Sequence, residues 1–126
     1  MEILSSRVII HPNDFGVSRR FYERVIGLRV AREWGVGAAY FLGGGLLELS
    51  SVGFVSTAST PVGSTTLWLQ IPSLDGIEAG LIEQGVTVAK PTETMPWGLM
   101  ELWINDPDGN ELRLIEVPED HPLRRR

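Results

Sequence analysis

Charged and aromatic side chains alternate with aliphatic ones along five short segments of the sequence. In each segment one set of alternate positions is aliphatic, and the other set carries arginine, glutamate, tryptophan, histidine or an amide. Alternation with a period of two is typical of a β-strand that has one face against a core. The residues on the second face that could do chemistry are Arg7, His11, Glu48, Thr66, Trp68, Trp103, Glu111 and Arg113.

These residue types suit the binding of a flat, negatively charged small molecule. A guanidinium offers a planar pair of donors to a carboxylate or phosphate, and an indole stacks on flat rings. Trp97, between Pro96 and Gly98, could place a further indole over such a site like a lid, and Trp34 is also expected in a loop. We therefore predict the lining of a cup; the alternative is a solvent face whose two tryptophans pack at a dimer interface.

Acid–base catalysis is a second possibility for the same face. His11 could act as a general base, but its position favours a hydrogen-bonded structural histidine. Glu48 and Glu111 are the carboxylates available for proton transfer in an enzyme. The sequence has no cysteine and no Ser–His–Asp order, so nucleophilic catalysis of those two kinds is not expected.

Composition narrows the range of partners. The formal net charge of −5 argues against a nucleic acid as the main partner. The absence of cysteine excludes a disulfide framework and a thiolate zinc site. The charge-free run of residues 35–47 is shorter than the roughly 20 residues of a membrane-spanning helix and contains five glycines. We expect a cytoplasmic protein that binds neither nucleic acid nor membrane.

The elements that must position these residues occur twice along the chain. A strand-like run, a polar turn, a short amphipathic helix and further strands appear in residues 5–52 and again in residues 65–117. Residues 53–64 are predicted to form a linker, and 118–126 a tail. Asp14 or Ser18 is expected to cap the first helix, and Gly27 and Gly85 are expected to end the two helices. Gly43–Gly45 is expected to form a hairpin turn, and residues 91–98 to be irregular. The predicted fold class is α+β, with one domain made of two tandem modules.

Several phrases of the sequence resemble the vicinal oxygen chelate superfamily. They are the helix phrase Ser18–Tyr22 with its continuation Ile26–Leu28, and the hairpin phrase Asp106–Asn110, in that order. This superfamily holds glyoxalase I, extradiol dioxygenases and bleomycin-resistance proteins. The resemblance implies two βαβββ modules whose curved mixed sheet forms a cup with helices on its outer face. It also implies pairing into a homodimer.

The resemblance further assigns four positions at which the family's enzymes hold a divalent metal. Here these positions fall on Arg7, Glu48, Thr66 and Arg113. Only Glu48 is a credible ligand, because a guanidinium stays protonated and has no lone pair to give. We therefore predict no metal and no cofactor. An Arg7–Glu48–Arg113 cluster would take the metal's place, either as an anion site or as an ion triad that only satisfies Glu48.

Three functions remain open from the sequence. The leading one is a metal-free binding protein of the bleomycin-resistance type that sequesters a planar or anionic compound through Arg7, Glu48, Thr66, Trp68, Trp97, Trp103 and Arg113. The second is a lyase, isomerase or epimerase that uses His11, Glu48 or Glu111 for acid–base chemistry and the arginines to stabilise an oxyanion. The third is a non-catalytic interaction domain whose cup is closed by salt bridges.

Overall fold

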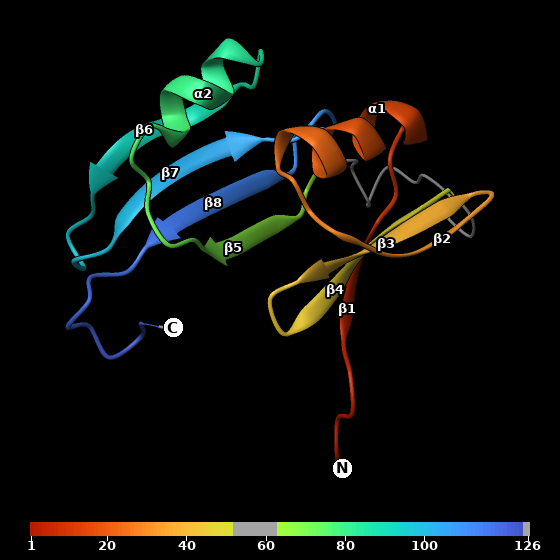
Figure 1. The fold of residues 1–126 in the computed structure, drawn as a ribbon, viewed down its shortest axis with the longest axis horizontal. Helices are drawn as coiled ribbons and strands as arrows, with labels where there is room; N and C mark the ends of the chain where they lie inside the picture. Colours follow the sequence, from red (N-terminus) through yellow and green to blue (C-terminus); the bar gives the residue numbers. More distant parts are fainter. Residues whose placement is uncertain (52–62, 125–126) are drawn as a thin grey trace. The chain divides into compact units, whose positions relative to one another are not determined.

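The computed structural model describes residues 1–51 and 63–124, and divides the chain into two compact units, residues 1–62 and 63–126. Each unit has a four-stranded mixed sheet and helical structure between its first and second strands (Figure 1). The predicted α+β fold of two βαβββ repeats is therefore confirmed. Residues 53–62 of the predicted linker lie outside the described residues.

The first unit forms a sheet with strand order β1-β4-β3-β2. Strand β1 runs parallel to β4, and the other neighbours are antiparallel. The helix α1 continues directly into a π-helical segment, η1. The elements are β1 (Arg7–Ile10), α1 (Phe15–Arg20), η1 (Phe21–Val25), β2 (Val30–Trp34), β3 (Gly37–Leu42) and β4 (Gly45–Ser50).

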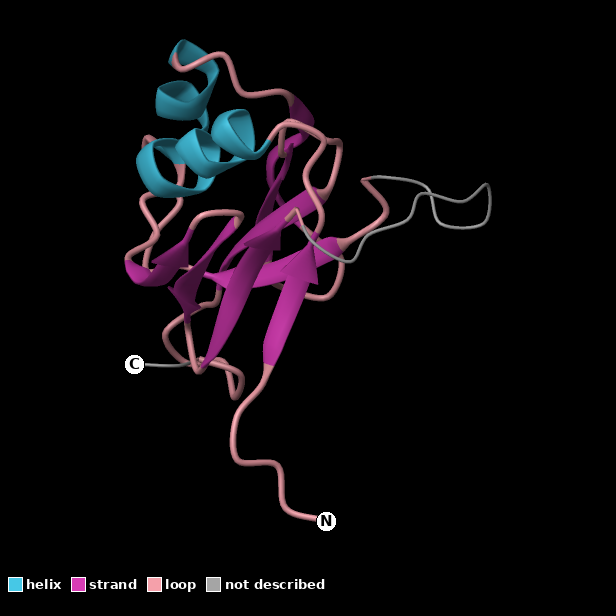
Figure 2. Cartoon of the chain, turned by 90° about the vertical axis from the view of Figure 1, so that its right-hand side faces the viewer, coloured by secondary structure: helices cyan, strands magenta, loops and turns pink. Residues whose placement is uncertain are grey.

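The second unit repeats this topology with the order β5-β8-β7-β6. Strand β5 runs parallel to β8, while β7 is antiparallel to both of its neighbours. The elements are β5 (Thr66–Gln70), α2 (Ile77–Glu83), β6 (Val88–Thr94), β7 (Met100–Asn105) and β8 (Glu111–Glu116). Figure 2 shows the helices in cyan and the strands in magenta, with the segment before β1 extending away from its strand.

Both helices begin and end much as the sequence predicts. The Asp14 carboxylate accepts a hydrogen bond from the Val17 amide at 3.0 Å and so caps α1. Gly27 and Gly85 follow the helical segments with positive φ angles of 83° and 81°, which only glycine adopts without strain. Glu78 in α2 accepts the Thr92 amide at 2.6 Å, and this bond lowers the pKa of Glu78.

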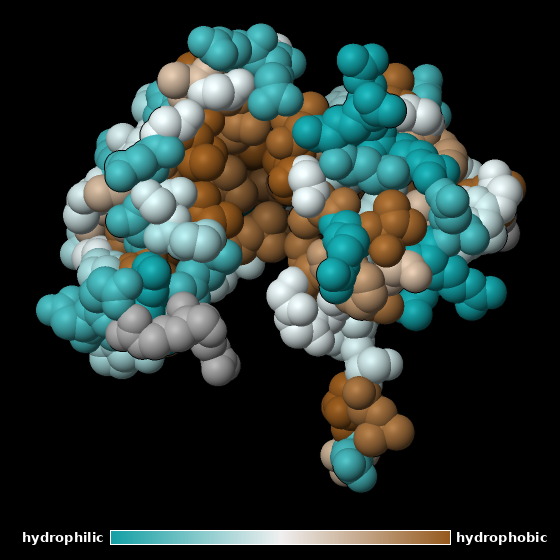
Figure 3. Space-filling model, viewed as in Figure 1, coloured by the Kyte–Doolittle hydropathy of each residue, from teal (hydrophilic) through white to brown (hydrophobic). Residues whose placement is uncertain are grey.

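The aliphatic face of each sheet is buried against its helix, as predicted. In the first unit α1 contacts β4, and in the second α2 contacts β6. The outward sides of both helices are hydrophilic (Figure 3). The buried strand residues of this face are Ile10, Leu47, Leu49, Leu67, Leu102, Ile104, Leu112 and Leu114. Some aliphatic residues are less covered: Val8 on the edge strand is 39% exposed, Ile82 on α2 is 53% exposed, and Leu69 on β5 is only partly buried.

A polar network joins η1 to the first sheet. Glu23 accepts hydrogen bonds from Arg19 Nε at 2.5 Å and from the Tyr40 hydroxyl at 2.9 Å. Arg19 also pairs with Glu33. Burial raises the pKa of the Tyr40 phenol, and the hydrogen bond to Glu23 raises it further. The network fixes the helix on the side of the sheet that carries the aliphatic core.

The predicted hairpin between β7 and β8 is held by one buried carboxylate. Asp106 Oδ1 accepts the backbone amides of Asp108 and Asn110 at 2.9 and 2.8 Å, and its Oδ2 accepts Asn110 Nδ2 at 2.8 Å. Asn110 Oδ1 in turn accepts the Thr65 amide at 3.0 Å, just before β5. The turn therefore also fixes β5 against β8.

No helix among the described residues is long and apolar enough to cross a membrane.

Candidate functional site

The structure brings Arg7 and Glu48 together on the face of the first sheet opposite its helix. In the parallel register of β1 and β4, Arg7 lies beside Leu46 and Ile9 beside Glu48. Arg7 Nη1 donates to Glu48 Oε1 at 2.7 Å, with the two side chains 47% and 14% exposed. The ion pair is thus half open to solvent on the arginine side, and Glu48 is the better covered partner.

A hollow of about 600 Å³ opens beside this ion pair. Glu48, Ala39 and Arg32 lie in one row across β4, β3 and β2. Because Ala39 has the shortest side chain of the row, the middle of the sheet is recessed between the two charged neighbours. The residues that line the hollow are Arg7, Ala31, Arg32, Trp34, Ala39, Leu46 and Glu48.

Trp34 and Arg32 are site residues that the sequence analysis missed. Trp34 was predicted in a loop, but it is the last residue of β2. Its ring lies so close to Gly37 that a Cβ there would come within 2.6 Å of it, so the tight β2–β3 connection depends on that glycine. The alternation of Arg32 and Trp34 was the available signal, since it places both on the face away from the helix.

On the second sheet, four predicted or related residues form a row across all the strands. Trp68, Arg113, Trp103 and Lys90 are neighbours in the register of β5, β8, β7 and β6. The Arg113 guanidinium carbon lies 3.9 Å from the centre of a Trp103 ring, and Lys90 Nζ lies 5.7 Å away. Two cations thus flank one indole, which is an electrostatically favourable arrangement.

Arg113 has a carboxylate partner within its own unit. Its Nε donates to Glu111 Oε1 at 2.6 Å, and the side chains are 36% and 26% exposed. Two of the predicted site residues are therefore joined in a pair that the sequence analysis did not anticipate. Of the predicted Arg7–Glu48–Arg113 cluster, the Arg7–Glu48 pair is the part formed within one unit. Thr66, the first residue of β5, is exposed.

Trp97 lies in a short turn, as predicted, but the irregular stretch is shorter than residues 91–98. Strand β6 continues to Thr94, with register shifts between Val88 and Glu93. Pro91 is accommodated because β6 is an edge strand, where a missing amide donor costs little. Trp97 is 54% exposed, and its Nε1 donates to Glu101 Oε2 at 2.7 Å.

His11 lies immediately after β1, and its ring is anchored to the backbone. Nδ1 is 2.9 Å from the Ser50 carbonyl oxygen. A carbonyl can only accept, so Nδ1 must carry the proton and donate. This bond joins the chain after β1 to the end of β4, which supports the structural alternative for His11.

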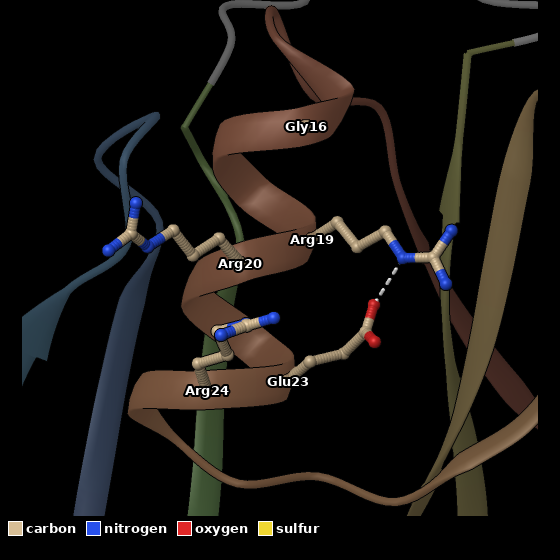
Figure 4. A pocket seen from close by; sticks show the side chains of 5 residues that line it. All are labelled: Gly16, Arg19, Arg20, Glu23 and Arg24. Atoms are coloured by element: carbon tan, nitrogen blue, oxygen red, sulfur yellow. Dashed lines mark hydrogen bonds and ion pairs between the residues drawn. The ribbon is translucent and has the colours of Figure 1, made fainter.

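A second hollow, of about 540 Å³, lies along α1 and η1 (Figure 4). It is lined by Gly16, Arg19, Arg20, Glu23 and Arg24. Figure 4 shows Arg19 and Glu23 turned toward each other, while Arg20 projects to the other side of the helix. Arg20 and Arg24 are exposed, whereas Arg19 and Glu23 belong to the network that joins the helix to the first sheet.

Comparison with known proteins identifies the family. No curated protein matches this sequence. The sequence model described as "Glyoxalase/Bleomycin resistance protein/Dioxygenase superfamily" matches residues 6–114. The chain belongs to this superfamily. The resemblance drawn from the helix and hairpin phrases is thereby confirmed.

Solved structures of the superfamily share the fold. A glyoxalase/bleomycin resistance protein from Catenulispora acidiphila is 27% identical, with 92% of this chain and 100% of that chain covered and a TM-score of 0.68. A superfamily member from Sphaerobacter thermophilus is 23% identical (92% and 98% covered, TM-score 0.73). A lactoylglutathione lyase from Agrobacterium tumefaciens is 18% identical (87% and 90%, TM-score 0.70). The last two likenesses show the fold alone.

The residues to which the resemblance assigns the metal positions do not fit a divalent cation. Arg7 and Arg113 are guanidinium donors, and each occupies a carboxylate oxygen, on Glu48 and Glu111 respectively. Structural and catalytic metal sites take about three or four protein ligands. No group of three or more histidines, aspartates or glutamates in residues 1–51 and 63–124 could hold a metal ion.

Proposed function

We propose that this superfamily member binds a planar, anionic small molecule without a metal and sequesters it unchanged. The observation that carries the proposal is the hollow beside the Arg7–Glu48 ion pair. It combines fixed positive charge with an indole, and it includes Arg7 and Glu48, two of the four positions that the resemblance assigns to a metal. The ligand-binding residues proposed in the first unit are Arg7 and Glu48, to which we add Arg32 and Trp34. Those proposed in the second unit are Thr66, Trp68, Trp97, Trp103 and Arg113.

The charges of the hollow favour an anion over a cation. Two arginines face one glutamate, so the lining carries a formal charge of +1. Glu48 is already paired with Arg7, whereas Arg32 forms no ion pair with any residue that the structure describes. A ligand carboxylate can therefore bind the Arg32 guanidinium without displacing an existing partner. The flat Trp34 ring beside it suits an aromatic ligand.

The contacts of the candidate acid–base residues support binding rather than catalysis. His11 donates to a backbone carbonyl, Glu48 accepts from Arg7, and Glu111 accepts from Arg113. A carboxylate oxygen that already accepts a hydrogen bond from a guanidinium is not free to take a proton from a ligand. Each of the three residues thus has a structural role that accounts for its position.

Isothermal titration calorimetry with 2-naphthoate tests the proposal. We expect saturable binding of 2-naphthoate, and much weaker binding of the uncharged analogue 2-naphthalenemethanol, because the analogue cannot pair with a guanidinium. A higher ionic strength should weaken the binding of 2-naphthoate and hardly affect the binding of 2-naphthalenemethanol. Equal affinity for the two compounds, or no heat from 2-naphthoate at millimolar concentration, would contradict an anion-binding hollow.

We also propose that the protein forms a homodimer. Strand β1 is an edge strand, and its exposed Val8 and Ile9 follow an N-terminal segment in which Ile3 and Leu4 are 70% and 85% exposed. The brown atoms near the N-terminus in Figure 3 belong to this apolar stretch. Exposed apolar surface of this kind favours association. Light scattering should give twice the chain mass; a monomer mass at high concentration would rule the dimer out.

A further inference from the structure

One carboxylate of the second unit is almost completely buried. Glu101, in β7, is 2% exposed, and its partner in the adjacent strand β8 is the fully buried Ile115. Leu99, Ile115 and Val117 form an apolar cluster on the same sheet face. A carboxylate in such surroundings is costly unless hydrogen bonds satisfy its charge. Within the described residues no arginine, lysine or histidine pairs with it.

Two indoles satisfy this carboxylate. Trp97 Nε1 donates to Oε2 at 2.7 Å, and Trp103 Nε1 donates to Oε1 at 2.8 Å. Each oxygen therefore accepts one indole N–H, in charge-assisted hydrogen bonds that are stronger than neutral ones. Trp103 lies two residues further along β7 on the same face, whereas Trp97 comes from the turn that precedes the strand.

The two bonds fix the orientation of both rings. An indole has a single polar group, so tying Nε1 leaves the ring little freedom except small tilts. The turn is also ordered by its own backbone, since the Met95 amide donates to the Leu99 carbonyl at 2.8 Å and the Gly98 amide to the Met95 carbonyl at 2.9 Å. The Trp97 ring nevertheless remains 54% exposed.

We propose that Glu101 is a positioning residue for ligand binding: it holds Trp97 and Trp103 as a preformed aromatic surface. The proposal rests on the proposed function, in which these tryptophans contact a flat ligand. It replaces the idea of a lid, because a ring bonded to a strand residue does not swing. A ligand that stacks on rings already in place avoids the entropy cost of ordering them.

The first test is independent of any ligand. The chain contains four tryptophans, so the ¹⁵N spectrum should show four indole Nε1–H signals, assignable with tryptophan-to-phenylalanine variants. The signals of Trp97 and Trp103 should exchange with water more slowly than that of Trp68. In Glu101→Gln at least one of them should lose its protection, since an amide oxygen can replace only one of the two acceptors.

The second test measures 2-naphthoate binding by calorimetry in Glu101→Gln and in Trp97→Phe. The phenylalanine variant keeps a flat ring at an exposed turn and removes only the donor. We expect each variant to remain folded, with a lower urea midpoint because a buried polar group loses its partner, and to bind 2-naphthoate about three- to tenfold more weakly. Their combined effect should be smaller than the product of the two, because both act on the hydrogen bonds of Glu101.

The outcomes separate this proposal from the proposed function. If the indole N–H signals of Trp97 and Trp103 exchange with water as slowly in Glu101→Gln as in the parent, Glu101 does not hold the two rings and the proposal is overturned. Lost protection with unchanged 2-naphthoate affinity in both variants would show that Glu101 is only structural, and would also overturn the proposal. If the parent protein does not bind 2-naphthoate, the proposed function fails, while the indole exchange still decides whether Glu101 holds both rings.

Discussion

Replacing Asp106 by alanine is expected to lower the free energy of unfolding by about 3–5 kcal/mol, the largest stability effect that we predict for this chain. Asp106 is 5% exposed and accepts three hydrogen bonds within the β7–β8 turn. Its removal leaves the buried donors of Asn110 without partners, and each buried donor left unpaired costs about 1–3 kcal/mol. Urea denaturation followed by tryptophan fluorescence measures the change.

Two variants make this prediction specific. Asp106→Asn keeps an oxygen for the backbone amides but turns an NH₂ group toward Asn110 Nδ2, so we expect a loss of about 1–3 kcal/mol. Asp75→Ala removes the same charge from an exposed turn and should change the free energy of unfolding by less than about 0.5 kcal/mol. If Asp106→Ala unfolds at the same urea concentration as Asp75→Ala, the carboxylate does not hold the hairpin.

Replacing Arg7 by glutamine is expected to weaken 2-naphthoate binding by about ten- to thirtyfold. The change removes one positive charge from the hollow and leaves Glu48, its paired carboxylate, to repel the incoming anion. Truncating one partner of a charge pair costs more than the lost contact, because the other partner stays behind uncompensated. The loss of affinity should be smaller than for a fully buried ion pair, because the Arg7 side chain is 47% exposed and water screens its charge.

Removal of the Glu48 charge is expected to rescue the Arg7→Gln variant. In the double variant Arg7→Gln with Glu48→Gln, the repelling carboxylate is gone, and most of the lost affinity should return. Arg24→Gln is the matched control, because it makes the same change of net charge on the exposed face of η1, outside this hollow. A double variant that binds no better than Arg7→Gln alone would contradict the electrostatic role of the pair.

The parts of the fold that depend on local signals could be predicted from the sequence. The Asp14 cap, the stops at Gly27 and Gly85 and the Asp106–Asn110 hairpin each rest on a side chain or backbone freedom within a few residues. The two-residue turn between β3 and β4 at Gly43 and Gly44 is of the same kind. The alternation of aliphatic residues then placed the buried face correctly, because burial on a sheet has a period of two.

The site was predicted less completely because it depends on register. Arg7 and Glu48 could be chosen from the resemblance, but their contact depends on how β1 slides along β4. Arg32 and Trp34 were missed because the end of β2 could not be located between glycines. The role of Glu101 depends on a turn that brings Trp97 back over β7, and no periodic pattern encodes such a return.

The central claim is that this superfamily member binds an anion through residues at positions to which the family resemblance assigns metal ligands. Its most direct test is calorimetry with 2-naphthoate before and after exhaustive dialysis against EDTA, on samples whose metal content is measured by elemental analysis. We predict the same affinity in both samples and no stoichiometric divalent metal in either. Near-equimolar metal whose removal abolishes 2-naphthoate binding, and whose return restores it, would contradict the claim.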